Sequence, residues 1–143
     1  MKIIVSACLL GDNVKYNGEN NLSEELKEFL KGHEIIKVCP EVMGGLTIPR
    51  NPCEIKNNKV INKLQEDKTQ EYQNGALKVL KLAQENNVKV AILKEKSPSC
   101  GSKYIYDGTF SHHLIKGEGI TTRILQKEGI IVLNEENYKE YKW

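Results

Sequence analysis

The stretch Val88-Lys89-Val90-Ala91-Ile92-Leu93 decides the fold, because it is nearly continuously apolar. Such a run is typical of a strand that is covered on both faces, as in a parallel sheet between layers of helices. The longest helix is expected just before it, over residues 67–87, where five side chains share one face: Tyr72, Ala76, Val79, Leu80 and Ala83. A helix that leads directly into a buried strand predicts a βαβ arrangement.

The rest of the chain continues this alternation of strands and helices. Further strands are expected at residues 2–7, 34–38 and 130–133, and helices at residues 22–30, 119–127 and 134–141. Two small hairpins, at residues 54–62 with a turn at Asn57-Asn58 and at residues 104–110, interrupt it. The sequence therefore predicts a single three-layer, Rossmann-like α/β domain over residues 1–143, with a mainly parallel four-stranded sheet in the order 2-1-3-4.

The composition excludes several classes of protein. The 21 Lys+Arg residues exceed the 19 Asp+Glu residues by only two, which is too small an excess for a nucleic-acid-binding surface. No apolar run approaches the roughly 20 residues of a membrane-spanning helix. The apolar segment ahead of the first cysteine is only Ile3-Ile4-Val5, whereas an export signal uses about 7–15 apolar residues. We therefore expect a cytoplasmic protein with reduced thiols.

Four cysteines are too few for a disulfide scaffold, but three of them occupy equivalent places. Cys8 directly follows the first expected strand, Cys39 directly follows the second, and Cys100 lies in the loop that leaves the third. Loops at the carboxyl ends of parallel strands open on one edge of the sheet, where open α/β folds bind ligands. We therefore expect these three thiols to converge. Cys53 begins the first hairpin and is expected to be a bystander.

Three converging thiolates indicate a metal site, and two kinds fit the pattern. Structural zinc usually takes four ligands, commonly with closely spaced cysteine pairs that this chain lacks. A zinc site could instead take its fourth ligand from His33, His112 or His113. A 4Fe–4S cluster held by three cysteines leaves one iron without a protein ligand and open to substrate.

The residues beside these cysteines add groups that can handle protons and ligands. Glu41 follows the second cysteine by two residues and can act as a general acid or base. Ser97 and Ser99 precede the third cysteine and can bind a polar ligand or move a proton. Gly44 and Gly45 allow a ligand to approach the backbone closely.

Taken together, these motifs resemble those of a known bacterial family. In chain order they are Ser6-Ala7-Cys8-Leu9-Leu10-Gly11, Cys39-Pro40-Glu41-Val42 with Gly44-Gly45-Leu46 and Pro49-Arg50, Ser97-Pro98-Ser99-Cys100-Gly101, and Tyr106-Asp107-Gly108-Thr109-Phe110. Over nearly its whole length the chain resembles a family long called a domain of unknown function, which includes the iron–sulfur-dependent thiouracil desulfidase.

The resemblance implies an α/β domain with an oxygen-sensitive 4Fe–4S cluster, whose three ligands match Cys8, Cys39 and Cys100. It implies that Glu41 is the catalytic carboxylate and that a serine takes part, Ser97 being favoured over Ser99. Ser99, Gly44 and Gly45 are expected to contact the substrate.

The implied activity is removal of sulfur from the thiocarbonyl of a thiouracil-like small molecule, by a hydrolase or a lyase. The open iron would polarise the C=S bond, and Glu41 would activate water or protonate the ring. The alternative is a non-catalytic protein that binds an iron–sulfur cluster or zinc, or that carries sulfur to a partner.

Overall fold

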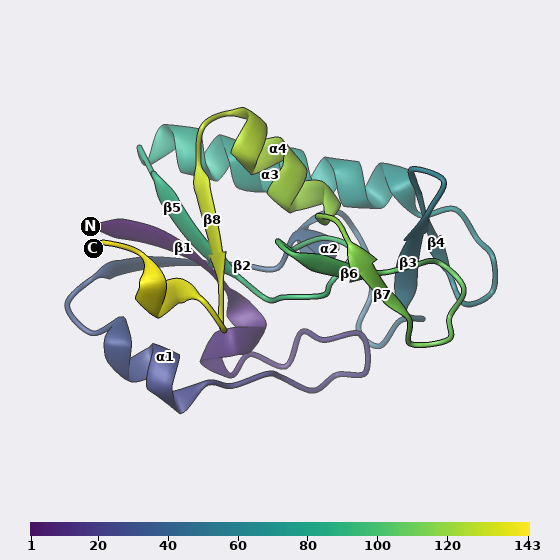
Figure 1. The fold of residues 1–143 in the computed structure, drawn as a ribbon, viewed down its shortest axis with the longest axis horizontal. Helices are drawn as coiled ribbons and strands as arrows, with labels where there is room; N and C mark the ends of the chain where they lie inside the picture. Colours follow the sequence, from purple (N-terminus) through teal and green to yellow (C-terminus); the bar gives the residue numbers. More distant parts are fainter.

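The computed structural model describes all 143 residues, and its centre is a parallel four-stranded sheet (Figure 1). The strands are β1 (Lys2–Ser6), β2 (Glu34–Val38), β5 (Val90–Leu93) and β8 (Ile131–Asn134). They pair in the order β2-β1-β5-β8, and every pair is parallel. Both the expected sheet and its expected order are therefore confirmed.

Helices cover both faces of the sheet. Helices α3 (Thr69–Glu85) and α4 (Ile120–Lys127) lie together over one face, and the shorter α1 (Glu24–Phe29) lies on the opposite side (Figure 1). The expected helix near the C-terminus is a single 3-10 turn, η2 (Tyr138–Glu140). The arrangement confirms a three-layer α/β fold. No helix is long and apolar enough to cross a membrane.

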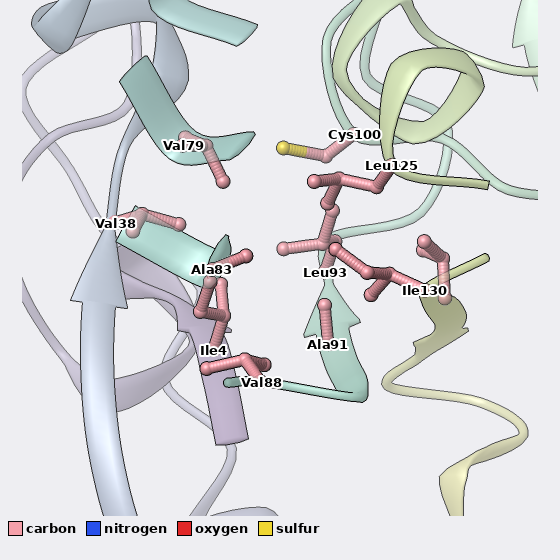
Figure 2. Packing of buried hydrophobic residues seen from close by; sticks show 11 residues of the cluster. Ile4, Val38, Val79, Ala83, Val88, Ala91, Leu93, Cys100, Leu125 and Ile130 are labelled. Atoms are coloured by element: carbon pink, nitrogen blue, oxygen red, sulfur yellow. The ribbon is translucent and has the colours of Figure 1, made fainter. Parts of the chain in front are cut away.

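Side chains along β1 alternate between two hydrophobic cores, because successive residues of a strand point to opposite faces. Ile4 packs beneath the long helix in the cluster that includes Val79 (Figure 2). Ile3 and Val5 pack on the other face, in the cluster that contains Leu26 of α1. All three strand residues are completely buried, which explains why the strand is apolar on both faces.

Two antiparallel hairpins accompany the sheet. The first, β3 (Cys53–Lys56) with β4 (Lys59–Asn62), is confirmed, and both residues of its Asn57-Asn58 turn have positive φ. The second was predicted wrongly: β6 (Tyr104–Tyr106) pairs with β7 (Leu114–Lys116), which lies beyond the expected boundary at residue 110. Backbone N–H groups of Gly108 and Phe110 donate instead to the buried Glu54 carboxylate, at 3.0 and 3.1 Å. These residues therefore form a wide loop fixed to the first hairpin.

Two short helices at the carboxyl edge of the sheet were not predicted. The 3-10 helix η1 (Ala7–Leu10) follows β1 directly, and α2 (Pro40–Met43) begins two residues after β2 ends. Each has only four residues, which is too short for a helical pattern of apolar residues. Pro40 is the first residue of α2, where its missing N–H costs nothing.

Candidate active site

The three cysteines expected to converge lie at the carboxyl ends of three neighbouring strands. Cys8 lies in η1 after β1, Cys39 is the N-cap residue of α2 after β2, and Cys100 lies in the loop after β5. Burial is the largest cause that raises the pKa of Cys100, and the charges of Cys8 and Cys39 raise it further. Burial is also the largest cause that raises the pKa of Cys8, and the charge of Cys39 adds to it. The three thiols therefore lie on loops at the same edge of the sheet.

Cys100 is the most deeply placed of the three thiols. It is only 5% exposed, and its sulfur is directed toward Val79 at the edge of the hydrophobic core (Figure 2). The Ser6 hydroxyl donates to its Sγ atom at 3.8 Å. Burial raises the pKa of Cys100 far above the ordinary range, and it also raises the pKa values of Cys8 and Cys39. A metal that binds these thiols would displace their protons.

Glu41 connects the second cysteine loop to the third. It lies in the first turn of α2, and its Oε1 atom accepts a hydrogen bond from Nε of Arg50 at 3.1 Å. Its Oε2 atom accepts a hydrogen bond from the Ser97 hydroxyl at 3.4 Å. The side chains of this ion pair are 17% exposed for Glu41 and 8% for Arg50. After burial, the Glu41 charge is the second cause that raises the pKa of Cys100. The carboxylate therefore lies between the second and third cysteine loops.

Cys53 belongs to the first hairpin rather than to the cysteine loops, although after burial the Glu41 charge also raises the pKa of its thiol. It lies on β3, where its thiol interacts with the buried Tyr72 hydroxyl and lies 3.9 Å from the Asn51 carbonyl oxygen. Burial raises its pKa to about 11. This thiol therefore belongs to the packing between the first hairpin and α3.

The donor set around the three thiols is unsuited to a single metal ion. No three His, Cys, Asp or Glu side chains lie close enough together to hold one ion, whose zinc–sulfur distances would be about 2.3 Å. Two of the three histidines considered as a fourth ligand make aromatic contacts: His33 stacks on Phe29 of α1, and His112 packs edge-on to Tyr106 of β6. The remaining soft donors are three thiols, which suit a larger iron–sulfur group.

Comparisons with known proteins assign the chain to a family. A model of the family described as 2-thiouracil desulfurase matches residues 3–137, a span that includes all three thiols, Glu41 and Ser97. The chain belongs to the 2-thiouracil desulfurase family. It is also 40% identical over 143 residues to an uncharacterized protein, YbbK, of Bacillus subtilis (strain 168), with 93% of this chain and 95% of that protein covered.

A solved structure has the same fold as this member of the 2-thiouracil desulfurase family. The 4Fe–4S-dependent thiouracil desulfidase TudS (DUF523Vcz) matches with a TM-score of 0.91 and 42% sequence identity. The match covers 97% of this chain and 93% of the TudS chain. The likeness therefore extends over the sheet, both hairpins and the cysteine loops.

The structure separates the two serines of the third loop in this family member. The Ser97 hydroxyl faces Glu41 and accepts hydrogen bonds from the backbone N–H groups of Ser99 and Cys100, at 3.0 and 3.1 Å. Ser99 is completely buried, and its hydroxyl pairs with that of Thr121 on α4 at 2.8 Å. The expected contact between Ser99 and the substrate remains a prediction, while its hydroxyl is bonded to Thr121 and shielded from solvent.

The two glycines after α2 also differ in their surroundings. A Cβ atom on Gly44 would lie 1.9 Å from the Glu71 carbonyl oxygen, and one on Gly75 would lie 1.8 Å from the Pro40 carbonyl oxygen. The expected close approach to Gly44 is therefore that of helix α3 rather than of a ligand. Gly45 has a φ of 102° and open space around it, so it remains available at the surface of the site.

Arg50 belongs to the Pro49-Arg50 motif, to which the sequence alone assigned no role in the site. In addition to its bond with Glu41, its Nη2 atom donates to the Val14 carbonyl oxygen at 2.9 Å, and its Nη1 atom donates to that of Thr47 at 3.1 Å. One signal was present: Arg50 is one of two arginines among 21 Lys+Arg residues. In a chain rich in lysine, an arginine marks a place where a planar, multiply bonded cation is needed.

Proposed function

We propose that this protein is a desulfidase that removes sulfur from the thiocarbonyl of a thiouracil-like small molecule, with a 4Fe–4S cluster bound by Cys8, Cys39 and Cys100. The observation that carries the proposal is the position of the three cysteines after neighbouring parallel strands, with Glu41 bonded to Ser97 of the third cysteine loop. The family match and the 42% identity to a 4Fe–4S-dependent thiouracil desulfidase support it.

The donor set fits this cofactor. Thiolates are the ligands that iron–sulfur clusters use, and these three come from separate loops rather than from one tight pair. When bound by three cysteines, such a cluster supplies one iron without a protein ligand, a soft Lewis acid suited to a thiocarbonyl sulfur. An oxygen-sensitive cofactor and four free cysteines also fit our proposal that the protein works in the cytoplasm.

The reaction proposed is a hydrolysis without net redox change. One water molecule is consumed, its oxygen replaces sulfur on the ring carbon, and the sulfur leaves as hydrogen sulfide or hydrosulfide. Glu41 handles the protons: its Oε2 atom accepts a proton from the attacking water, or delivers one to the ring. Because its Oε1 atom is paired with Arg50, Oε2 is the oxygen placed to do so.

Ser97 is proposed to orient the Glu41 carboxylate for this proton transfer. Its hydroxyl lies 3.4 Å from Oε2 of Glu41, and its bonds from the Ser99 and Cys100 N–H groups fix it within the third loop. Because its one proton goes to Glu41 and both its lone pairs accept backbone N–H bonds, this hydroxyl is proposed to act on the ring only through the carboxylate that it holds. Gly45 is proposed to line the same opening, where its lack of a side chain leaves room for the ring.

Anaerobic reconstitution with iron and sulfide tests the ligand assignment. We expect the broad visible absorption of a 4Fe–4S cluster in the wild type and in Cys53→Ala, and its loss in Cys8→Ala, Cys39→Ala and Cys100→Ala. Cys53→Ala is the matched control, because Cys53 is also a buried free thiol but lies on β3. A cluster that survives Cys100→Ala but not Cys53→Ala would show that the assignment is wrong.

Turnover tests the activity and separates it from the alternative. The reconstituted wild type is expected to convert thiouracil to uracil with release of sulfide over many cycles. A protein that binds iron but releases no sulfide would be a non-catalytic metal-binding protein or a sulfur carrier. Metal analysis of protein purified without oxygen separates iron from zinc.

A further inference from the structure

The Arg50 side chain joins three segments around the site. Its guanidinium group donates to the Glu41 carboxylate, to the Thr47 carbonyl oxygen and to the Val14 carbonyl oxygen, the last of which lies in the loop that follows Cys8. Its own backbone N–H donates to the Tyr16 carbonyl oxygen at 2.7 Å in that same loop. With only 8% of the side chain exposed, the guanidinium is fixed in place.

This arrangement gives the two oxygens of Glu41 different surroundings. Oε1 is held by Nε of Arg50, and Oε2 faces Ser97. The terminal torsion of a glutamate is broad and nearly two-fold, so a carboxylate without such a partner would exchange its oxygens and swing away from its target. The two backbone carbonyls keep the guanidinium plane fixed, and the guanidinium in turn fixes the carboxylate.

We propose that Arg50 is a positioning residue for the desulfidation reaction: it holds Oε1 of Glu41 so that Oε2 stays directed at Ser97 and the substrate. This inference rests on the proposed function, since it assigns Glu41 the proton transfer. A misplacement of about 1 Å in a reacting group costs about 100-fold in rate. Loss of Arg50 should therefore lower the rate of the chemical step and leave substrate binding nearly unchanged.

The test compares Arg50→Met with the wild type after anaerobic reconstitution. We expect kcat to fall about 100-fold. Three other quantities should stay within about threefold of the wild type: KM, the Kd for thiouracil measured by visible titration, and the amount of iron per chain. Arg50→Lys returns a cation to Oε1 but not the planar guanidinium that the two carbonyls hold, so it is expected to recover only part of the lost kcat. The matched control is Lys94→Met, which removes the cation from another partly buried ion pair, Lys94–Glu135, near Cys8; its kcat should stay within about threefold.

A second readout does not depend on turnover. In the apoprotein, Arg50→Met should lower the urea midpoint less in a Glu41→Gln background than in the wild-type background, because the two side chains form one contact. Equal effects in the two backgrounds would overturn the proposal whatever the activity of the protein.

The kinetic outcomes are equally decisive. The proposal is overturned if Arg50→Met keeps kcat within threefold of the wild type, if Arg50→Lys recovers nothing, or if Arg50→Met fails to fold or to bind iron. In the last case the arginine would serve only the loops that carry the cysteines. If the wild type forms no uracil, the proposed function is refuted instead. The urea measurements on the apoprotein would then decide whether Arg50 fixes the position of the Glu41 side chain.

Discussion

Replacement of Gly75 by alanine tests the contact that places α2, and with it Cys39 and Glu41, at the edge of the sheet. Helices α2 and α3 meet backbone to backbone, so a Cβ atom on Gly75 would lie 1.8 Å from the Pro40 carbonyl oxygen and 2.8 Å from its carbon. Real Cβ atoms essentially never approach closer than 3.0 Å, so the helices must separate by at least 1.2 Å (3.0 minus 1.8).

Two opposing effects decide the sign of the change in stability. Alanine in place of glycine inside a helix stabilises by about 1 kcal/mol through helix propensity. Overpacking a well-filled contact costs about 1–3 kcal/mol, and this position lies at the upper end because the atoms that clash belong to the backbone and cannot rotate away. The net result is a loss of about 2 kcal/mol, which lowers a urea midpoint by about 1 M when the slope is about 2 kcal/mol per M.

Urea unfolding of the apoprotein, followed by circular dichroism, measures this loss, and iron binding measures its effect on the site. The expected shift of α2 also displaces Cys39, so iron per chain should fall in Gly75→Ala. Asn74→Ala is the control on the same helix; Asn74 is exposed, and its replacement should change stability by less than about 0.5 kcal/mol. A Gly75→Ala protein as stable as the wild type would refute the close contact of the two helices.

Three further predictions concern single side chains. Glu41→Gln should keep the visible absorption of the cluster and lower kcat by about 100-fold or more, and near-normal turnover would remove Glu41 from the proton transfer. Ser97→Ala should lower kcat per bound cluster more than Ser99→Ala does, because only the Ser97 hydroxyl faces Glu41. A larger loss of kcat in Ser99→Ala would contradict this placement. Because its pKa is raised from 9.0 to about 11, the Cys53 thiol holds less thiolate at pH 8 than an ordinary cysteine, by a factor of about 100. The test uses a protein with the other three cysteines replaced and follows alkylation of Cys53 by mass spectrometry. The alkylation rate should increase with pH up to about pH 11, and a rate that levels off near pH 9 would contradict the raised pKa.

The sheet could be predicted because its signals are local. Residues 88–93 and 2–7 are apolar runs, and each predicts a strand without knowledge of any partner. The right-handed connection of parallel strands then limits the order of strands to a few possibilities. The same topology places Cys8, Cys39 and Cys100 at one edge, so the thiols of the site followed from the strands alone.

The parts that could not be predicted depend on contacts between distant residues. Ser97 and Ser99 are indistinguishable in the sequence, and only the packing of Thr121 against Ser99 shows which one faces the core. Gly44 looked like an opening for a ligand, whereas its partner is Gly75 on another helix. The return strand of the second hairpin is displaced because the Glu54 carboxylate binds the intervening backbone.

The most direct test of the account is the conversion of thiouracil in water labelled with oxygen-18, with anaerobically reconstituted protein and no added oxidant or reductant. A hydrolytic desulfidase should form uracil with one labelled oxygen, together with one sulfide for each uracil, over many turnovers. Uracil without the label, or an iron-replete protein that leaves thiouracil unchanged, would contradict the proposed reaction.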